Sequence, residues 1–478
     1  MASTRGSELL RLLIDAESFV DLPTMPDVAA LNWPDASPYD GVVTGLGRVN
    51  GQPVVVFVQD ASYLGGSVGT VHGRQIAAAQ TYALTNRLPI IGIWNGGGAR
   101  LQDGVNALTV VGNIFHNNVT AKGIIPQISL VLGPCAGAAC YSPALTDFLI
   151  TAADTTKMFL TGPAVTADFI GETTSIEELG GAEIHSHNGV ADYVAPDAAA
   201  AIAFARQLLP YLVRDAAAPS HYAKHDQVSS PGSARPGDVG SPHSALPDSK
   251  GPSLPESPTQ PYDVRNVLTS IFDLDTFIEL QAEYAPNLVT GLAHLSNKPV
   301  AIVASQPAVL AGTLDADATD KGSRFINTAA SFGLPIITFV DVPGFLPGVA
   351  QEKAGIIRHG ANLVSAYVNA KVPKFTVIMR KGYGGAYIAL DSMSLGATKV
   401  FAWPGAHISI MGAAGAVDVL HHRALAELST AMAAERRKVL IEQFEANSPG
   451  LTAAIESGQV TAIIDPADTR AALIEALG

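Results

Sequence analysis

The sequence is poor in cysteine, in charge and in basic residues. It has two cysteines, charged residues make up 15% of the 478 residues, and 29 lysines and arginines stand against 43 aspartates and glutamates. Cys135 and Cys140 form neither a disulfide framework nor a Cys-x-x-Cys pair, so we interpret both as small buried side chains. The formal net charge of -14 argues against nucleic acid or an anionic membrane as a partner, because both need a basic surface.

Signatures of several common enzyme classes are also missing. The sequence has no P-loop, no dinucleotide-binding glycine motif after its first predicted strand, no His-Glu-x-x-His and no Gly-x-Ser-x-Gly elbow. The start, MASTRGSELLRLL, lacks the features of a secretory signal, so we expect a cytoplasmic location. The uncharged stretch 123–146 contains three prolines, which predicts a buried strand, a turn and a helix instead of a membrane span.

The sequence repeats itself once. VTGLGRVNGQPVVVFVQDASYLGG, from Val43, matches VTGLAHLSNKPVAIVASQPAVLAG, from Val289, at an offset of 246. Three further pairs keep the same order along both halves: LLIDAESFVDL with SIFDLDTFIEL, LPIIGIW with LPIITFV, and IPQISLVLGPCAGAAC with VPKFTVIMRKGYGGAY. This pattern predicts two related domains, 1–213 and 262–478. The Pro-, Ser- and Gly-rich segment 214–261 between them is either a disordered insertion or an extended strap.

Within each copy, short apolar runs alternate with alanine-rich stretches. PVVVFVQ and PIIGIW have the length and the β-branched residues of buried strands, whereas GRQIAAAQTYALTNR is typical of a helix. The alternation predicts βαβ units in a largely parallel sheet, and therefore the α/β class. Ligands of such folds gather where the carboxyl ends of strands meet the N-termini of helices.

Four glycine-rich turns follow predicted strands at repeat-related positions. They are GGGAR at 96–100, CAGAA at 135–139, DVPGFLPG at 341–348 and YGGAY at 383–387. Glycine and alanine leave backbone N–H groups uncovered, and a helix that begins there adds the positive end of its dipole. Two converging donors can stabilise a thioester enolate without any titratable side chain. The alternative, that the glycines only permit close packing, explains one turn better than four related ones.

At these turns the sequence resembles the carboxyltransferase (β) subunits of biotin-dependent acyl-CoA carboxylases, the propionyl-CoA and acetyl-CoA carboxylase family. The likeness is carried by IWNGGGARLQDG, GPCAGAACYSPALTDF, DVPGFLPG, RKGYGGAYIAL and ATKVFAWPGAHISIMGAAGAV, and extends from about Glu8 to Ala472. It implies two tandem crotonase-like (ClpP/crotonase) domains and a hexamer, with each active site between the N-terminal domain of one subunit and the C-terminal domain of a neighbour. The first domain would bind acyl-CoA and the second biotin.

The resemblance also assigns site residues. The catalytic backbone donors would be Gly97, Gly98, Gly137, Ala138, Gly385 and Ala386. Acyl-CoA would contact Gly96, Ala99, Arg100, Cys135, Ala136, Tyr141 and Ile388. Biotin would contact Gly344, Phe345, Tyr383, Gly384 and Tyr387, and no metal is expected. For Arg100, an internal ion pair that structures its turn is the alternative to a contact with a CoA phosphate.

Three positions depart from the family pattern. Ile388 stands where many members have Asp, Gly96 where Ser is common, and Ala138 where Gly is common. In the family the position of Ile388 borders the acyl pocket, so the preferred acyl length stays open and chains longer than propionyl are admitted. The changes at the other two positions keep the backbone amides.

The expected reaction moves a carboxyl group from carboxybiotin to the α-carbon of a short- or medium-chain acyl-CoA, with the cofactor as the base. No biotin-acceptor Met-Lys-Met and no ATP-grasp segment is present. A separate biotin carboxylase and a biotin carboxyl carrier, which brings biotin in trans, are therefore implied.

Three rival functions stay open. A biotin-dependent decarboxylase or transcarboxylase would use the same half-reaction on malonyl- or methylmalonyl-CoA. A crotonase-like hydratase or isomerase would need a carboxylate base near the second oxyanion helix, where the only acid, Asp147, lies two turns further along. A catalytically silent scaffold is disfavoured because both pairs of turns look intact.

Overall fold

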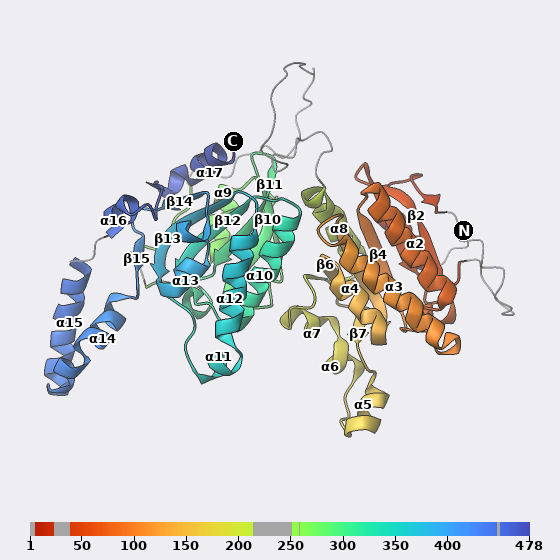
Figure 1. Cartoon of the computed structure of the whole chain (residues 1–478), viewed down its shortest axis with the longest axis horizontal. Helices are drawn as coiled ribbons and strands as arrows, with labels where there is room; N and C mark the ends of the chain where they lie inside the picture. Colours follow the sequence, from red (N-terminus) through yellow and green to blue (C-terminus); the bar gives the residue numbers. More distant parts are fainter. Residues whose placement is uncertain (1–4, 23–38, 214–250, 258, 447–449) are drawn as a thin grey trace, which may run out of the picture.

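Each half of the sequence folds around a mixed sheet with the same strand order (Figure 1). The structure is a computed structural model, and it describes residues 5–22, 39–213, 251–257, 259–446 and 450–478. The first sheet has the order β1-β2-β3-β4-β5-β6-β8, with β7 beside β5, and the second has the order β9-β10-β11-β12-β13-β14-β16, with β15 beside β13. Strand for strand the second sheet repeats the first, which confirms the predicted α/β class and the duplication.

The strands of the two sheets correspond in sequence as well as in position. The first sheet contains β1 (Val20–Asp21), β2 (Val42–Val49), β3 (Gln52–Gln59), β4 (Ile90–Gly96), β5 (Gln127–Ala136), β6 (Phe148–Ala152), β7 (Lys157–Phe159) and β8 (Tyr193–Ala195). The second contains β9 (Ile278–Leu280), β10 (Leu288–Leu295), β11 (Lys298–Ser305), β12 (Ile336–Val342), β13 (Lys374–Tyr383), β14 (Lys399–Ala402), β15 (His407–Ser409) and β16 (Ala462–Ile463). The first three strands of each sheet are antiparallel and the later ones parallel, so the glycine-rich turns meet at one edge.

Helices cover both faces of each sheet. The first half contains α1 (Arg5–Leu13), α2 (Thr70–Asn86), α3 (Val105–Ala121), α4 (Tyr141–Leu145), α5 (Pro163–Ile170), α6 (Ile176–Gly180), α7 (Ala182–His187) and α8 (Ala198–Leu212). The second contains α9 (Val264–Ile271), α10 (Ala316–Ser331), α11 (Val349–Lys353), α12 (Ile356–Asn369), α13 (Gly384–Ala389), α14 (Ala413–Ala426), α15 (Thr430–Ala446), α16 (Gly450–Glu456) and α17 (Thr469–Leu477).

The central strands are buried on both faces, which explains their continuous apolar runs. In β3, Val54 and Val56 belong to the apolar cluster that includes α1 and α8, whereas Val55 and Phe57 belong to the cluster that includes α2 and α3. Successive side chains of a strand point to opposite faces, so a strand covered by helices on both sides needs apolar residues at every position. The run PVVVFVQ was therefore correctly interpreted as a buried strand.

The two domains contact each other directly. The backbone N–H of Gln281, just after β9, donates to Asp192 O at 2.7 Å, and Arg324 Nη1 on α10 donates to Gly189 O at 2.6 Å. Tyr211 on α8 donates through its hydroxyl to Thr276 O at 2.6 Å. One apolar cluster continues from the α1 and α8 side of the first sheet to the α10 and α12 side of the second. The domains therefore share a packed interface.

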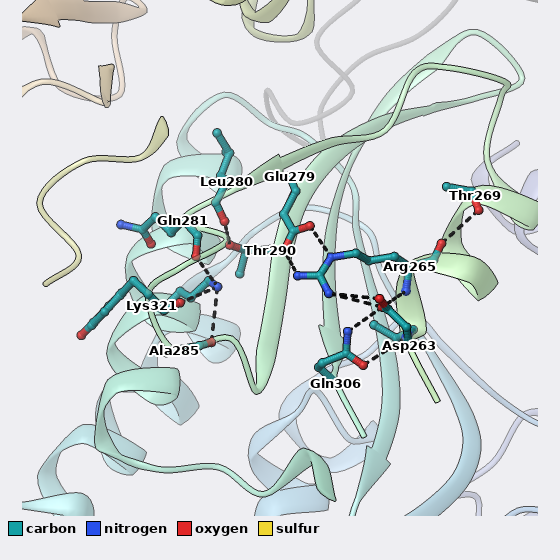
Figure 2. A network of polar contacts seen from close by, with 12 residues as sticks. Asp263, Arg265, Thr269, Glu279, Leu280, Gln281, Ala285, Thr290, Gln306 and Lys321 are labelled. Carbon is teal, nitrogen blue, oxygen red and sulfur yellow. Dashed lines mark hydrogen bonds and ion pairs between the residues drawn. The ribbon is translucent and has the colours of Figure 1, made fainter. Parts of the chain in front are cut away.

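A buried lysine supports the turn that makes this contact. Lys321 Nζ on α10 donates to the carbonyl oxygens of Gln281 and Tyr284, each at 2.8 Å, and Figure 2 shows its side chain reaching this turn. Gln281 and Ala285 have φ angles of 54° and 43°, which side chains rarely adopt. The Lys321 side chain thus holds a strained turn in the conformation that contacts the first domain.

The end of the predicted linker packs on the second domain. The carbonyl oxygens of Ser257 and Gln260 accept hydrogen bonds from Arg380 on β13. Residues 214–250 and 258 lie outside the described residues, so the choice between an insertion and a strap concerns mainly that part. In the part of the chain that the structure describes, every helix is too short or too polar to cross a lipid bilayer.

Candidate active site

In the first domain, the turns after β4 and β5 lie against each other. A Cβ atom on Gly98 would come within 2.5 Å of Ala136 O, and Gly98 has a φ angle of +90°. Both facts require glycine at this position, because a side chain would clash with the neighbouring turn and strain the backbone. The structure therefore brings together the two turns that the sequence analysis paired.

The backbone donors of these turns differ in availability. The amide of Gly97 donates to Gly65 O at 3.0 Å, so it is engaged by a neighbouring loop. Gly137 and Ala138 begin a 3-10 helix, Gly137–Cys140, that continues into α4. The first amides of a helix have no partner within it, and these two belong to half-buried residues that follow Ala136, the neighbour of Gly98. Of the expected donors, Gly97 is thus the one whose amide is bound to another loop.

The second domain repeats this arrangement. Val68 N donates to Gly98 O at 2.7 Å in the first domain, and Leu314 N donates to Gly344 O at 3.1 Å in the second. In both sheets the register shifts at the same place, between Trp94 and Gly96 and between Val340 and Val342. The amides at the start of α13 thus occupy the same place as those at the start of the 3-10 helix.

Two glycines mark the equivalent helix starts. Gly137 has a φ angle of +64° and Gly384 of +59°, so the repeat aligns Gly137 and Ala138 with Gly384 and Gly385. The pair expected from the resemblance, Gly385 and Ala386, begins one residue later. Gly385 is exposed and belongs to both pairs, so it is the donor on which the two alignments agree.

The turn before α11 contributes an aromatic wall. A Cβ atom on Gly385 would lie 3.7 Å from the ring of Phe345, and Pro343 stands at the repeat position of Gly97. Proline has no N–H group, so this turn lacks the hydrogen bond that Gly97 makes to another loop. Tyr383 and Tyr387 flank the start of α13, with Tyr387 buried and Tyr383 half-buried. Most of the expected biotin contacts therefore gather around one helix start.

Arg100 forms the internal ion pair. Its Nη1 lies 2.7 Å from Asp40 Oδ1, and its Nη2 and Nε donate to Ser67 O and Oγ at 2.8 and 3.1 Å. Arg100 is 6% exposed and Asp40 is 5% exposed. Of the two alternatives for Arg100, the structure contains the ion pair that holds the turn, whereas the CoA contact stays a prediction.

A buried chain of hydrogen bonds continues from this ion pair. Asp40 Oδ2 accepts from the backbone N–H of His72, His72 Nε2 lies 3.1 Å from Gln59 Nε2, and Gln59 Oε1 accepts from the N–H of Asn95 on β4. Complete burial lowers the pKa of His72 to about 4, so the ring is neutral at physiological pH. These residues lie far apart in the sequence and match no motif, so the sequence alone does not predict their contact.

A second buried ion pair holds the corresponding strand ends of the C-terminal domain. Arg380 Nε lies 2.9 Å from Asp341 Oδ2, which also accepts from the Tyr262 hydroxyl at 3.0 Å. The guanidinium lies over the Tyr262 ring, 4.9 Å from its centroid. Asp341 is the first residue of the segment DVPGFLPG. Its carboxyl group is bound to Arg380 and Tyr262, so it supports the turn and does not face the site.

The rim of both turns is apolar. Tyr141 and Ile388 stand four residues after the equivalent glycines Gly137 and Gly384 and are 50% and 47% exposed. Leu160 and Ile410, whose carbonyl groups lie beside Gly137 and Gly384, are 55% and 84% exposed. An apolar chain could therefore lie beside either helix start.

Asp147 and the cysteines lie away from the rim. Asp147 Oδ2 accepts from Gln127 N at 2.9 Å, and the carboxyl group lines a cavity between the two domains. It therefore does not serve as the base that a hydratase would need beside the oxyanion turn. Cys135 and Cys140 are buried, and Cys140 Sγ donates to Cys135 O at 2.8 Å, as expected for small buried side chains.

The chain also matches a known protein family. Residues 6–478 match the model of the carboxyl transferase domain. The chain is 43% identical over 481 residues to the propionyl-CoA carboxylase beta chain of Saccharopolyspora erythraea, covering 98% of this chain and 86% of that one. It is 42% identical over 474 residues to the methylmalonyl-CoA decarboxylase subunit alpha of Veillonella parvula, covering 98% and 88%.

A solved structure is similar over the whole chain. The transcarboxylase 12S, described as a hexamer with methylmalonyl-CoA bound, has a TM-score of 0.86 and 38% identity, covering 99% of this chain and 88% of that one. This likeness, together with the two matching sheets, confirms the expected pair of tandem crotonase-like domains.

Proposed function

This chain belongs to the carboxyl transferase domain family, and on that premise we propose that it moves a carboxyl group from carboxybiotin to the α-carbon of an acyl-CoA. It is a carboxyltransferase subunit of the propionyl-CoA carboxylase type. The observation that carries the proposal is the pair of glycine-rich turns in each domain, with helix starts at equivalent positions.

The N-terminal domain is assigned to the acyl-CoA. Removal of the α-proton of a thioester places negative charge on the carbonyl oxygen, and N–H groups fixed in advance stabilise that charge. Gly98 with Gly137 and Ala138 would supply these donors, since the amide of Gly97 is engaged. Loss of one such donor costs about 3–4 kcal/mol in transition-state stabilisation.

The C-terminal domain is assigned to biotin. Its ureido oxygen is an acceptor, which fits the amides at Gly385 and Ala386, and the Phe345 ring beside Gly385 offers a flat apolar wall. When bound as carboxybiotin, the cofactor supplies the carboxyl group and the base for the α-proton. The residues of this chain orient both reactants and exclude water, so no titratable side chain is needed at the turns.

The acyl group is proposed to be short or medium in length. Ile388 and Ile410 expose apolar surface beside Gly384, where a carboxylate would repel a longer hydrocarbon chain. We expect acyl chains longer than propionyl to be accepted. The reverse direction, decarboxylation or transcarboxylation of methylmalonyl- or malonyl-CoA, is the second candidate, because relatives with those names are as similar to this chain as the carboxylases are.

The assembly and the partners follow from the same family. We propose a homo-hexamer, like the one described for the 12S protein, with sites between the N-terminal domain of one subunit and the C-terminal domain of another. Biotin would arrive on a carrier protein that a separate biotin carboxylase charges, as the names of relatives described as beta chains or beta subunits of carboxylases suggest. We place the reaction in the cytoplasm.

An assay with ATP, bicarbonate, the biotinylated carrier and its carboxylase tests this function. Acyl-CoA substrates from acetyl to octanoyl should be carboxylated, and Gly385→Pro, which removes one N–H at a position where a helix tolerates proline, should abolish the reaction with the oligomer intact. Exchange only between malonyl- or methylmalonyl-CoA and biotin, without ATP-dependent carboxylation, would favour the second candidate. Normal turnover by Gly385→Pro would overturn the role of the turn.

A further inference from the structure

The turn after β4 is held at both of its ends. At its start, the backbone N–H of Asn95 donates to Gln59 Oε1 at 3.0 Å. At its end, Arg100 Nη1 lies 2.7 Å from Asp40 Oδ1 in the buried ion pair. The glycines 96–98, which include two of the expected catalytic donors, lie between these two points. A residue that fixes Gln59 relative to Asp40 would therefore fix both ends of this turn.

His72 on α2 connects these two supports. Its backbone N–H donates to Asp40 Oδ2 at 3.0 Å, and its ring Nδ1 lies 2.8 Å from Asp40 O. Its ring Nε2 lies 3.1 Å from Gln59 Nε2. Water does not compete for these bonds, because His72 is fully buried and Gln59 and Asp40 are 2% and 5% exposed. Asp40 also has a φ angle of 41°, a strained conformation that persists only where its surroundings hold it. We call Asp40, His72 and Gln59 the His72 chain.

The position of each proton in the His72 chain follows from its two ends. The carbonyl oxygen of Asp40 can only accept, so His72 Nδ1 carries the proton of the ring. Because the ring is neutral, its Nε2 has no proton and accepts from Gln59 Nε2. The Gln59 oxygen then faces the N–H of Asn95, which can only donate. Every donor meets an acceptor, and no other arrangement of a neutral ring achieves this.

The second domain does not repeat the His72 chain. At the repeat offset of 246, Gln59 corresponds to Ser305 and His72 to Ala318. The alanine side chain has no donor or acceptor, and Ser305 Oγ is buried without a hydrogen-bond partner among the described residues. The His72 chain therefore supports the turn of the domain that is assigned to the acyl-CoA, and not the equivalent turn of the domain that is assigned to biotin.

The Gln59 side chain lies directly against the glycines of the turn. A Cβ atom on Gly96 would lie 3.1 Å from Gln59 Oε1. The donors of an oxyanion hole act at about 2.7–3.1 Å from the oxyanion, and a misplacement of about 1 Å can lower a rate about a hundredfold. A shift of the Gln59 side chain would therefore reach the amides that are expected to bind the thioester oxygen, although His72 itself is fully buried.

We propose that His72 is a positioning residue of the carboxyltransferase reaction, which acts through Gln59 and Asp40 to hold the turn 96–100 where its amides meet the oxygen of the acyl-CoA thioester. The inference rests on the function proposed above, because the turn matters for catalysis only if it binds that oxygen. His72 transfers no proton in the reaction. Its neutral ring is a rigid link with a donor on one side and an acceptor on the other.

Two substitutions of His72 separate the two sides of its ring. In His72→Asn the side-chain amide can take the place of Nδ1 and donate to Asp40 O, but nothing accepts from Gln59. In His72→Gln the side-chain oxygen can take the place of Nε2 and accept from Gln59, while the bond to Asp40 O is lost. Each variant loses one hydrogen bond of the buried ring, so both should lose stability to a similar extent.

Steady-state carboxylation kinetics should distinguish the two variants. We expect His72→Asn to lower kcat about 10–100-fold with little change in KM for the acyl-CoA, because only the transition state needs the aligned amides. His72→Gln should keep most of kcat, since Gln59 keeps its acceptor. If His72 were merely structural, the two variants would lose kcat alike.

Hydrogen exchange measured by mass spectrometry gives a readout that does not depend on activity. The amide of Asn95 should exchange faster in His72→Asn than in His72→Gln or the unmodified chain, because Gln59 Oε1 is no longer held in place. The matched control is Gln80→Leu on the same helix. Gln80 is 3% exposed and its Nε2 lies 3.4 Å from Ile114 O, so its loss should change neither kcat nor the exchange of Asn95.

Normal kcat in His72→Asn, or an equal loss of kcat in both His72 variants, would overturn the positioning role while leaving the proposed function in place. No carboxylation by the unmodified chain would refute the proposed function instead, and the exchange of Asn95 then decides by itself whether His72 holds the turn. If His72→Asn does not fold, Gln59→Met cuts the same link and should lower kcat in the same way. Normal kcat in Gln59→Met would also overturn the proposal.

Discussion

The two domains hold the same turns with different side chains. At one repeat position β4 has Asn95 and β12 has Asp341, and at another β5 has Gly133 while β13 has Arg380. In the first domain the Asn95 side chain occupies the space beside Gly133, so no larger residue fits there. In the second domain the same space contains the buried Asp341–Arg380 ion pair. The two domains thus keep the same backbone conformation in these turns although different side chains pack beneath them. This indicates that the backbone of the turns, and not the side chains beneath it, is the functional element.

The largest effect is expected from removing one partner of that ion pair. Arg380→Leu leaves Asp341, which is fully buried, without its cation and should destabilise the C-terminal domain by about 3–5 kcal/mol. Thermal or urea unfolding measures this loss. The control is Arg437→Leu, since the Arg437–Asp418 pair is 39% and 51% exposed, so water and salt screen it and its loss should have a much smaller effect. Equal effects of the two changes would mean that burial does not distinguish the pairs.

Substitution of Gly98 tests whether the packing of the two turns in the first domain matters for catalysis. Gly98→Ala combines a φ angle of +90° with a contact of 2.5 Å to Ala136 O, so it should displace the turn and lower kcat about 10²–10³-fold. Gly97→Ala should change kcat much less, because the nearest atom to its added Cβ, Gly65 O, is 3.6 Å away. Steady-state carboxylation kinetics of both variants make the comparison. A similar loss in both would contradict the distinction between the two glycines.

Ile388 and Tyr141 are equivalent in the repeat but are expected to affect selectivity differently. Ile388→Asp adds a carboxylate to an apolar rim and should lower kcat/KM for octanoyl-CoA relative to propionyl-CoA by about tenfold. Tyr141→Phe removes only a hydroxyl group and should leave this ratio unchanged. A competition assay with both substrates measures the ratio directly, and an unchanged ratio in Ile388→Asp would remove the residue from the acyl pocket.

The sequence predicted the duplication, the strands and the turns because each depends on local pattern. Apolar runs buried on both faces and glycines at strand ends are visible in one segment at a time. The supports of the turns could not be predicted, because Asp40, His72 and Gln59 meet only after β2, β3 and α2 have packed. The engagement of the Gly97 amide was equally hidden, since its acceptor, Gly65, lies in another loop.

The smallest effect on stability is expected from Asp147 and Asp192, two carboxyl groups of the first domain whose equivalents in the second domain are threonines. Burial raises the pKa of Asp147 to about 7 and that of Asp192 to about 6, whereas Thr398 and Thr461 at the equivalent positions carry no charge. Asp147 Oδ1 is buried and has no hydrogen-bond partner within the described residues. The domain interface thus contains carboxyl groups that hold protons more tightly when folded than when unfolded.

The pKa of the Asp147 carboxyl group is higher in the folded protein than its unfolded value of 3.8. Protonation of this group therefore stabilises the folded state at low pH, and this contribution is lost as the pH rises towards 7. Asp147→Asn can keep the bond from Gln127 N and stays neutral at every pH. At pH 8 we expect the variant to gain about 1 kcal/mol in the free energy of unfolding, which corresponds to a rise in Tm of about 2–4 °C. At pH 5 its Tm should change little. Thr398→Ser, which keeps the equivalent bond in the second domain, should shift Tm by the same small amount at both pH values. A larger gain for Asp147→Asn at pH 5 than at pH 8 would reverse the sign and show that the ionised carboxylate stabilises the interface.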